Sequence, residues 1–211
     1  MREVLYIAAK QPCAGEVKTR LAASIGAQAA ADLYAAFLAD LNTTFSNVSF
    51  QVCWYISGAN GWARPHLKQK DGDWSQRQAA LFAGMKERGE DRVLLVASDS
   101  PQLSSVRIRE AFDLLGRFDL VLGPVLDGGY YLIGMRDWHD VFAGTRMTSA
   151  TTAEDILVRA AELGLSIALL EPTFDVDEVA DLRLLSDILD QRPDLEHSRA
   201  ALARIMAGSL P

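Results

Sequence analysis

The sequence has 211 residues, of which 49% are hydrophobic and 23% are charged, and its formal net charge at pH 7 is −7. A chain of this length and composition can bury a hydrophobic core of its own, which excludes a disordered protein and removes the need for disulfides. The acidic balance excludes a broad electrostatic grip on a nucleic acid polymer, because such binding needs a basic surface.

The cysteines and the N-terminus indicate the compartment. Cys13 and Cys53 form neither a metal-binding spacing nor a disulfide framework. No basic region leads into a long apolar run at the N-terminus, and residues 4–9 are too few for a signal-peptide core or a membrane span. We therefore expect a cytoplasmic protein with no membrane span.

Hydrophobic periodicity predicts strands that alternate with helices. In chain order, we expect a strand at 3–9, a helix that begins near residue 18, a helix at 27–45, a strand at 49–56, a loop at 58–73, a helix at 76–88, a strand at 92–97, a helix at 104–115, strands at 119–122 and 130–135, a helix at 154–163, a strand at 166–170, and helices at 178–189 and 195–206. The run RVLLVA at 92–97 is continuously apolar, which is typical of a strand buried on both faces.

This alternation predicts an α/β fold of the Rossmann-like kind, with a mainly parallel sheet and helices on both faces. The sequence shows no internal repeat and no linker, so we expect one domain over residues 1–211. Ligands of such sheets bind outside the carboxyl ends of the strands, and candidate site residues should therefore follow strands.

The loop after the first strand is a basic island in an acidic chain. Its candidate phosphate-binding residues are Lys10, Gly15, Lys18, Thr19 and Arg20. The cations would neutralise phosphate oxygens, and the glycine would allow the ligand to approach the backbone. A surface loop with solvated lysines is the alternative. A Walker A loop is excluded because Val17 stands where glycine must precede the lysine, and no G-x-G-x-x-G follows the strand.

Two groups of acidic residues are candidate metal ligands: one follows a central strand, and the other precedes a late helix. Asp99 comes directly after the strand at 92–97, and Asp175 and Asp177 precede the helix expected at 178–189. Mg²⁺ commonly takes one or two protein carboxylates together with phosphate oxygens, so Asp99 and either Asp175 or Asp177 are candidate metal ligands. Turn or helix capping is the alternative for each of them.

The third candidate loop contains Asp127, Gly128, Gly129 and Tyr130. The carboxylate would act as a general base for an acceptor hydroxyl or hold a sugar, and the two glycines would let a ligand lie against the backbone. An Asp-Gly pair is also an ordinary hairpin turn, and this reading stays open.

Three segments together resemble bacterial glycosyltransferase A-type proteins, some of which are labelled arsenosugar-biosynthesis glycosyltransferases. The segments are Lys10-x-Pro12-x-x-Gly15-x-Val17-Lys18-Thr19-Arg20-Leu21, Ser98-Asp99-Ser100-Pro101-x-Leu103 and Gly123-Pro124-x-x-Asp127-Gly128-Gly129-Tyr130-Tyr131-Leu132-Ile133-Gly134. The resemblance implies a nucleotide-diphospho-sugar transferase fold, related to phospholactate and molybdenum-cofactor nucleotidyltransferases. It also implies that the first loop holds nucleotide phosphates, that Asp99 helps to bind Mg²⁺ or Mn²⁺, and that Asp177 matches a second ligand position.

We therefore expect a metal-dependent glycosyltransferase that moves a sugar from a nucleotide sugar to a small-molecule acceptor. The first alternative is a nucleotidyltransferase, which would join a nucleoside triphosphate to a phosphorylated acceptor and release pyrophosphate. The second alternative is a non-catalytic nucleotide-binding protein, because a fold alone does not fix a function. A homodimer stays open.

Overall fold

A computed structural model describes residues 1–58, 62, 64–145, 147 and 150–208, and it contains two compact units. The sheet unit comprises Met1–Ala9, Val48–Ala97 and Val106–Phe174, and the helical unit comprises Lys10–Asn47, Ser98–Ser105 and Asp175–Pro211. Among the described residues, no helix combines the length and the apolar character that crossing a membrane requires. The expectation of a single domain stays a prediction.

The described strands form one seven-stranded sheet in the order β3-β2-β1-β4-β6-β5-β7. The strands are β1 (Glu3–Lys10), β2 (Gln51–Ser57), β3 (His66–Lys68), β4 (Arg92–Ala97), β5 (Leu120–Pro124), β6 (Tyr130–Met135) and β7 (Ile167–Leu169). Strand β1 is parallel to β4, β2 to β3 and β5 to β7, whereas β6 is antiparallel to both of its neighbours. The mainly parallel sheet predicted from the sequence is thus confirmed.

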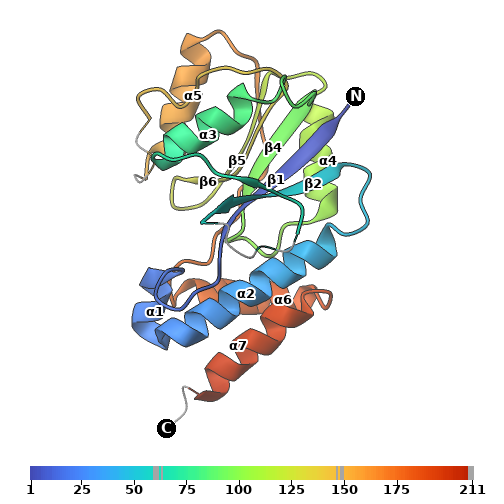
Figure 1. Cartoon of the computed structure of the whole chain (residues 1–211). Helices are drawn as coiled ribbons and strands as arrows, with labels where there is room; N and C mark the ends of the chain where they lie inside the picture. Colours follow the sequence, from blue (N-terminus) through green and yellow to red (C-terminus); the bar gives the residue numbers. More distant parts are fainter. Residues whose placement is uncertain (59–61, 63, 146, 148–149, 209–211) are drawn as a thin grey trace. The chain divides into compact units, whose positions relative to one another are not determined.

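Helices cover both faces of the sheet within the sheet unit. On one face, α3 (Trp74–Ala83) and α5 (Thr152–Glu162) pack against the apolar side chains of the strands (Figure 1). Helix α4 (Ser105–Leu114) lies on the other face. Gly134 of β6 marks its close approach, because a Cβ added there would meet the side chains of Leu94 in β4 and of Leu115, the residue just after α4. The side chains of β4 from Val93 to Val96 are at most 2% exposed, as expected for a strand covered on both faces.

Most elements of the sheet unit differ from their expected bounds by one or two residues, but α3 ends at Ala83 rather than at residue 88. Two differences have a clear physical cause. Helix α3 begins at Trp74 rather than at residue 76, because Asp73 and Gln76 form a reciprocal capping box with N···O distances of 2.9 Å. The loop expected at 58–73 contains the short strand β3, which pairs with β2. Residues 59–61 and 63 of that loop lie outside the described residues.

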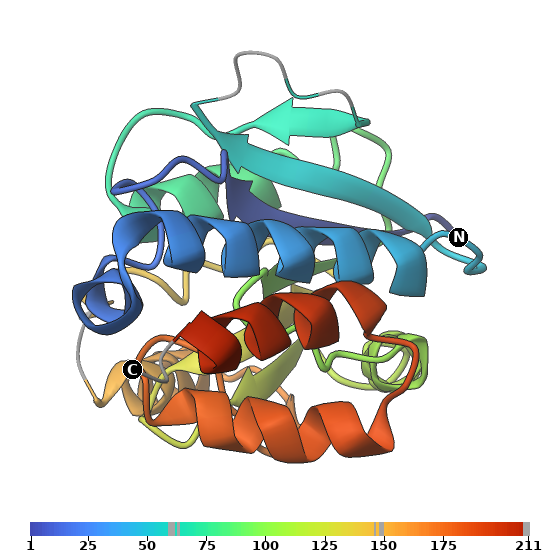
Figure 2. The same cartoon turned by 90° about the horizontal axis from the view of Figure 1, so that it is seen from below.

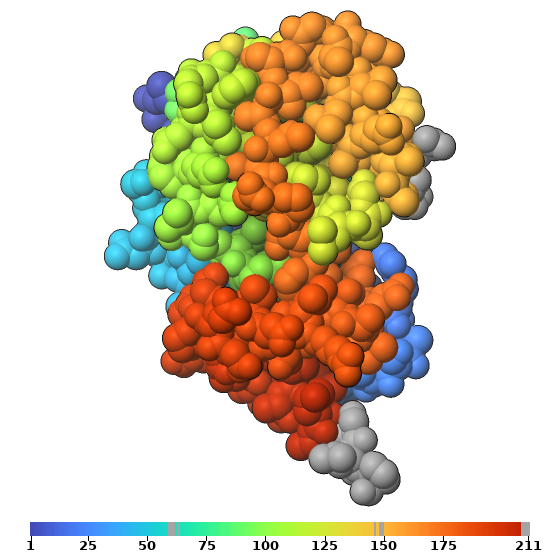
Figure 3. Space-filling view, turned by 180° about the vertical axis from the view of Figure 1, so that it is seen from behind, coloured from blue at the N-terminus to red at the C-terminus, as the bar shows by residue number. Residues whose placement is uncertain are grey.

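The helical unit contains α1 (Thr19–Ile25), α2 (Ala27–Thr44), α6 (Asp181–Gln191) and α7 (Glu196–Gly208). Figure 2 shows α7 lying between α2 and α6, and it contacts both of them. The face in Figure 3 shows the C-terminal segment with α6 and α7, in orange to red, on the surface of this unit. The buried carboxylate of Asp40 in α2 accepts the N–H groups of His197 and Ser198 at 3.1 and 2.7 Å, and it thereby caps α7.

Candidate functional site

The loop after β1 places Lys18 in an unusual backbone conformation. Lys18 is the N-cap of α1, with φ 48° and ψ 45°, and among the described residues it is the only non-glycine residue with a positive φ. This left-handed conformation costs about 1–3 kcal/mol for a residue with a Cβ, so the surrounding contacts must hold it. Gly15 in the same loop also has a positive φ of 84°, and the space beside its Cα is open.

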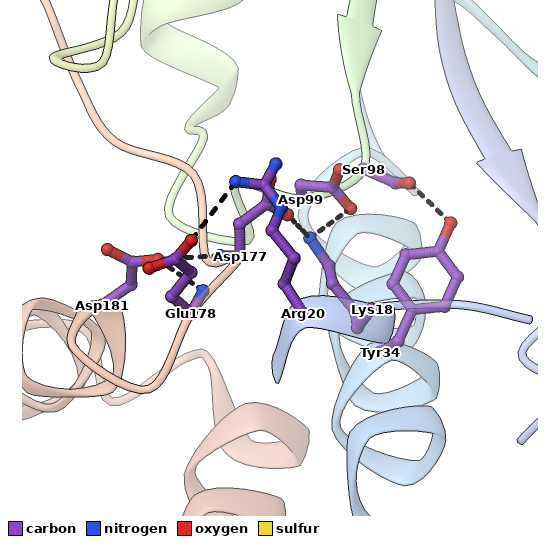
Figure 4. Close-up of polar contacts among 8 residues, drawn as sticks. All are labelled: Lys18, Arg20, Tyr34, Ser98, Asp99, Asp177, Glu178 and Asp181. Carbon is purple, nitrogen blue, oxygen red and sulfur yellow. Dashed lines mark hydrogen bonds and ion pairs between the residues drawn. The ribbon is translucent and has the colours of Figure 1, made fainter. Parts of the chain in front are cut away.

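The ammonium group of Lys18 lies between two carboxylates (Figure 4). Its Nζ atom is 2.7 Å from Asp99 Oδ1 and 2.9 Å from Asp177 Oδ1, and the Lys18 side chain is only 4% exposed. Burial is the largest influence on the pKa of Lys18 and acts to lower it, but the charges of Asp99 and Asp177 together outweigh burial and raise the pKa. Lys18 is therefore a buried, charged ammonium group.

Arg20 and Asp181 fix Asp177 from two further directions. The Arg20 Nη2 atom donates to Asp177 Oδ2 at 2.8 Å, and the Asp181 carboxylate accepts the backbone N–H groups of Asp177 and Glu178 at 2.9 and 2.7 Å. Burial acts to raise the pKa of Asp177, but Lys18 and then Arg20 outweigh it and lower the pKa. Because the turn is closed by Asp181, α6 begins there rather than at residue 178 as expected.

Hydrogen bonds within the helical unit hold Ser98 and Asp99, the two residues that follow β4. Val176 donates its backbone N–H to the carbonyl oxygen of Asp99 at 3.0 Å, which brings the two acidic segments together. The Tyr34 hydroxyl lies 2.8 Å from Ser98 Oγ and accepts the backbone N–H of Lys10 at 3.1 Å. Burial, assisted by the nearby charge of Asp99, raises the pKa of Tyr34 to about 12, so this hydroxyl stays protonated.

The donor set of this cluster suits a hard divalent cation. Asp99 and Asp177 each direct a carboxylate oxygen at the same cation, and Mg²⁺ often takes two carboxylates while it keeps waters and phosphate oxygens. The side chains of Asp99 and Asp177 are 35% and 26% exposed, so both are open to solvent. Within the described part of the chain, no three or more His, Cys, Asp or Glu residues are grouped as metal ligands, so water and substrate would complete the coordination.

The cluster is acidic in sum, although the sequence suggests a basic loop. Lys18 and Arg20 stand against the four carboxylates of Asp99, Asp177, Glu178 and Asp181, which leaves a formal charge of −2. Two of the expected phosphate ligands, Lys18 and Arg20, are thus paired with acids. The other three, Lys10, Gly15 and Thr19, are exposed. Of the two acids before α6, Asp177 is the one that contacts Lys18. Asp175 contributes only a smaller electrostatic effect, which helps Asp177 to raise the pKa of Arg20.

The third candidate loop belongs to the sheet unit, where its glycines and tyrosine are involved in packing. A Cβ on Gly128 (φ 92°) would lie 1.8 Å from the carbonyl oxygen of Ala150, so this close approach is to the protein's own backbone. The Tyr130 hydroxyl is buried and donates to Gln78 Oε1 at 2.8 Å, and burial raises its pKa. Asp127 is exposed, and its Oδ1 atom accepts the N–H of Gly129 at 3.1 Å.

Solved structures share the fold of this chain. A protein from Desulfovibrio desulfuricans G20, provisionally identified as a nucleotide-diphospho-sugar transferase, is 25% identical over 97% of this chain and 99% of its own, with a TM-score of 0.87. A cytidylyltransferase from Leptospira borgpetersenii serovar Hardjo-bovis has a TM-score of 0.58 at 13% identity, over 99% and 94% of the two chains. A CMP:2-keto-3-deoxy-manno-octonic acid synthetase complexed with CTP has a TM-score of 0.52 at 11% identity, over 91% and 100%.

The sheet order and these likenesses define the class: the chain has the α/β fold of the nucleotide-diphospho-sugar transferases. Residues 20–149, more than half of the chain, match the family described as "Uncharacterized protein conserved in bacteria (DUF2064)". The protein belongs to that family. A search of the curated proteins finds no significant match.

Proposed function

We propose that this protein is a metal-dependent transferase that acts on a nucleotide-diphosphate substrate, and that it transfers a sugar from a nucleotide sugar to a small acceptor. The observation that carries the proposal is the convergence of Asp99 and Asp177 on one buried cation, Lys18 Nζ, at 2.7 and 2.9 Å. The provisional identification of the Desulfovibrio desulfuricans protein as a nucleotide-diphospho-sugar transferase supports the same class of substrate.

The charge of the cluster gives a physical reason for metal dependence. A diphosphate that approached a cluster with a formal charge of −2 would be repelled unless further positive charge came with it. A bound Mg²⁺ or Mn²⁺ would supply that charge and stabilise the departing diphosphate. Asp99 and Asp177 are the residues that would hold the ion, and Lys18, Arg20 and the exposed Lys10 are the cations available to phosphate oxygens.

The transfer itself needs few protein groups. The acceptor hydroxyl oxygen forms a bond to the anomeric carbon, and the bond from that carbon to the diphosphate oxygen breaks. The nucleoside diphosphate leaves with the electron pair, and the hydroxyl proton passes to a base. Asp127 stays our predicted base, since its carboxylate is exposed and, among the described residues, accepts one hydrogen bond, from the N–H of Gly129.

Nucleotidyl transfer is the competing function for the same site. A nucleoside triphosphate would then be attacked at its α-phosphorus by an acceptor phosphate, and pyrophosphate would leave. Relatives of this kind, such as the synthetase complexed with CTP, share the fold of the chain, and fold likeness leaves the choice of reaction open. A non-catalytic nucleotide-binding protein on this scaffold is the third candidate.

The test is a thermal-shift screen against nucleoside diphosphates, nucleotide sugars and nucleoside triphosphates, with and without Mg²⁺ or Mn²⁺. A ligand at 100 times its Kd stabilises the fold by roughly 2.7 kcal/mol, which is readily detected. Metal-dependent stabilisation by a nucleoside diphosphate and its sugar, followed by release of that diphosphate with an acceptor, would support glycosyl transfer. Release of pyrophosphate from a triphosphate would support nucleotidyl transfer. Saturable binding without turnover would support a non-catalytic nucleotide-binding protein. No stabilisation of folded protein by any ligand would contradict the proposal.

A further inference from the structure

Lys18 occupies the place that a divalent ion would take. Its ammonium group contacts Oδ1 of Asp99 and Oδ1 of Asp177. Since Arg20 holds Asp177 Oδ2, an ion that bridged the two acids would need Asp177 Oδ1, the oxygen on which Lys18 lies. A lysine ammonium and a divalent cation cannot both lie between the same two oxygens, because the two positive charges would repel each other at contact distance. Lys18 and the metal therefore exclude one another.

We propose that Lys18 is the resident cation of the free protein and that it must withdraw from Asp99 and Asp177 before a divalent ion binds there. The inference rests on the proposed function, since it concerns the same two carboxylates. It assigns Lys18 two alternating partners: the acids in the free protein, and the phosphate oxygens of the substrate once the ion has taken its place.

The contacts around Asp177 explain how the site would survive the exchange. Arg20 holds the other oxygen, Oδ2, at 2.8 Å, and Asp181 holds the backbone N–H of Asp177 at 2.9 Å. Asp99 is held through its backbone carbonyl, which accepts the N–H of Val176. None of these three contacts involves Lys18, so the Asp177 carboxylate and the backbone of Asp99 keep their places when the ammonium leaves.

The backbone of Lys18 supports the same inference. Its left-handed conformation is strained for a residue with a Cβ, and its buried ammonium group meets the two acids at the far end of the side chain. Withdrawal of the ammonium would remove one restraint on this strained residue. The resident lysine also prevents Asp99 and Asp177 from facing each other as uncompensated like charges.

The test measures Mn²⁺ binding to the full chain without nucleotide, by the electron paramagnetic resonance signal of free Mn²⁺. Lys18→Met removes the competing charge and should tighten Mn²⁺ binding by about tenfold or more relative to wild type. Arg20→Met is the matched control, because it also removes one positive charge from Asp177 but leaves the position between the carboxylates filled. Its gain should be clearly smaller. An equal gain in both variants, or no gain in folded Lys18→Met, would overturn the proposal.

A measurement on the wild-type protein covers the case in which Lys18→Met does not fold. The ¹⁵Nζ signal of a buried, ion-paired lysine is protected from solvent, and Lys18→Arg identifies it by its loss. Saturation with Mg²⁺ should shift or remove this signal, whereas an unchanged signal in the Mg²⁺-bound protein would overturn the exchange. Asp99→Asn separates the two proposals: if Mn²⁺ binds this variant as it binds wild type, the metal site itself is wrong, and if binding is lost, only the role of Lys18 is under test.

Discussion

The backbone N–H of Val176 donates to the backbone carbonyl oxygen of Asp99 at 3.0 Å, and within the helical unit this bond joins the segment Ser98–Ser105 to the segment before α6. Its consequence is that Asp99 and Asp177 direct carboxylate oxygens at one point, which Lys18 Nζ occupies. The two backbone segments that carry the acids are thus paired directly with each other. Such pre-organisation is what a site for a highly charged ligand requires.

Asp99→Asn should abolish metal-dependent stabilisation by nucleotides. The amide keeps the size of the carboxylate but loses the charge that a hard cation needs, and Lys18 is left with a single acid. The measurement is the thermal shift produced by nucleoside diphosphate with Mn²⁺. Asp32→Asn is the control, since Asp32 is an exposed acid of the same unit that bonds only to Gln28 among the contacts described. A normal metal response in the Asp99 variant would remove Asp99 from the site.

Gly128→Ala and Gly15→Ala should differ in their effect on stability, although both glycines have a positive φ. At Gly128 the added Cβ would lie 1.8 Å from the Ala150 carbonyl oxygen, so strain and overlap together should cost at least about 2 kcal/mol. At Gly15 nothing lies within 4 Å of the added Cβ, and only the conformational cost of about 1–2 kcal/mol is expected. Urea unfolding of both variants measures the difference. Equal losses would show that the Ala150 contact yields at little cost.

Much of the fold is predictable because local pattern and tertiary burial agree. Strand β4 has the bounds expected from the sequence. A strand that helices cover on both faces must be apolar at every position, and a continuous apolar run is easily recognised. Strand β3 is not predictable, because three residues are too few to show an alternation of apolar and polar side chains. Their extended conformation depends on pairing with β2, in which Trp54 lies opposite His66. Hydrophobic periodicity does not report such an edge strand.

The candidate site is predictable in its acids and less so in its cations. Asp99 follows the rule that ligands bind beyond strand ends, and Asp177 is expected from its place before a late helix. The structure brings the two acids together. The pairing of Lys18 with Asp177 joins residues 159 positions apart, so no local pattern reveals it. The role of Tyr34 is not predictable for the same reason: in the sequence it is one more position on the buried side of a helix, and only the fold places its hydroxyl beside Ser98 Oγ.

Asp40→Ala should destabilise the protein by about 2 kcal/mol without changing its response to ligands. Asp40 is 1% exposed, and its carboxylate accepts two backbone N–H groups at the start of α7. In the alanine variant these two N–H groups lose their hydrogen-bond acceptor. Asp40→Asn should cost less, because the amide oxygen can still accept one of the two bonds. Urea unfolding gives the loss, and Mn²⁺ binding should remain at the wild-type level. A loss below about 0.5 kcal/mol would contradict the capping role.

Acid should destabilise the protein partly through Asp119, which lies outside the candidate site. The side-chain and backbone hydrogen bonds from Ser166, with a smaller contribution from Arg136, lower the pKa of Asp119 from 3.8 to about 2. A lowered pKa means that the unfolded chain binds the proton more readily, so this contribution to stability is full above about pH 4 and is lost as the pH falls towards 2. Ser166→Ala should flatten the pH dependence of the unfolding free energy in this window more than Arg136→Met does, and Asp119→Asn should flatten it most. Urea unfolding at intervals between pH 5 and pH 2 measures these slopes. A slope in Asp119→Asn equal to that of wild type would assign the acid sensitivity to other carboxylates.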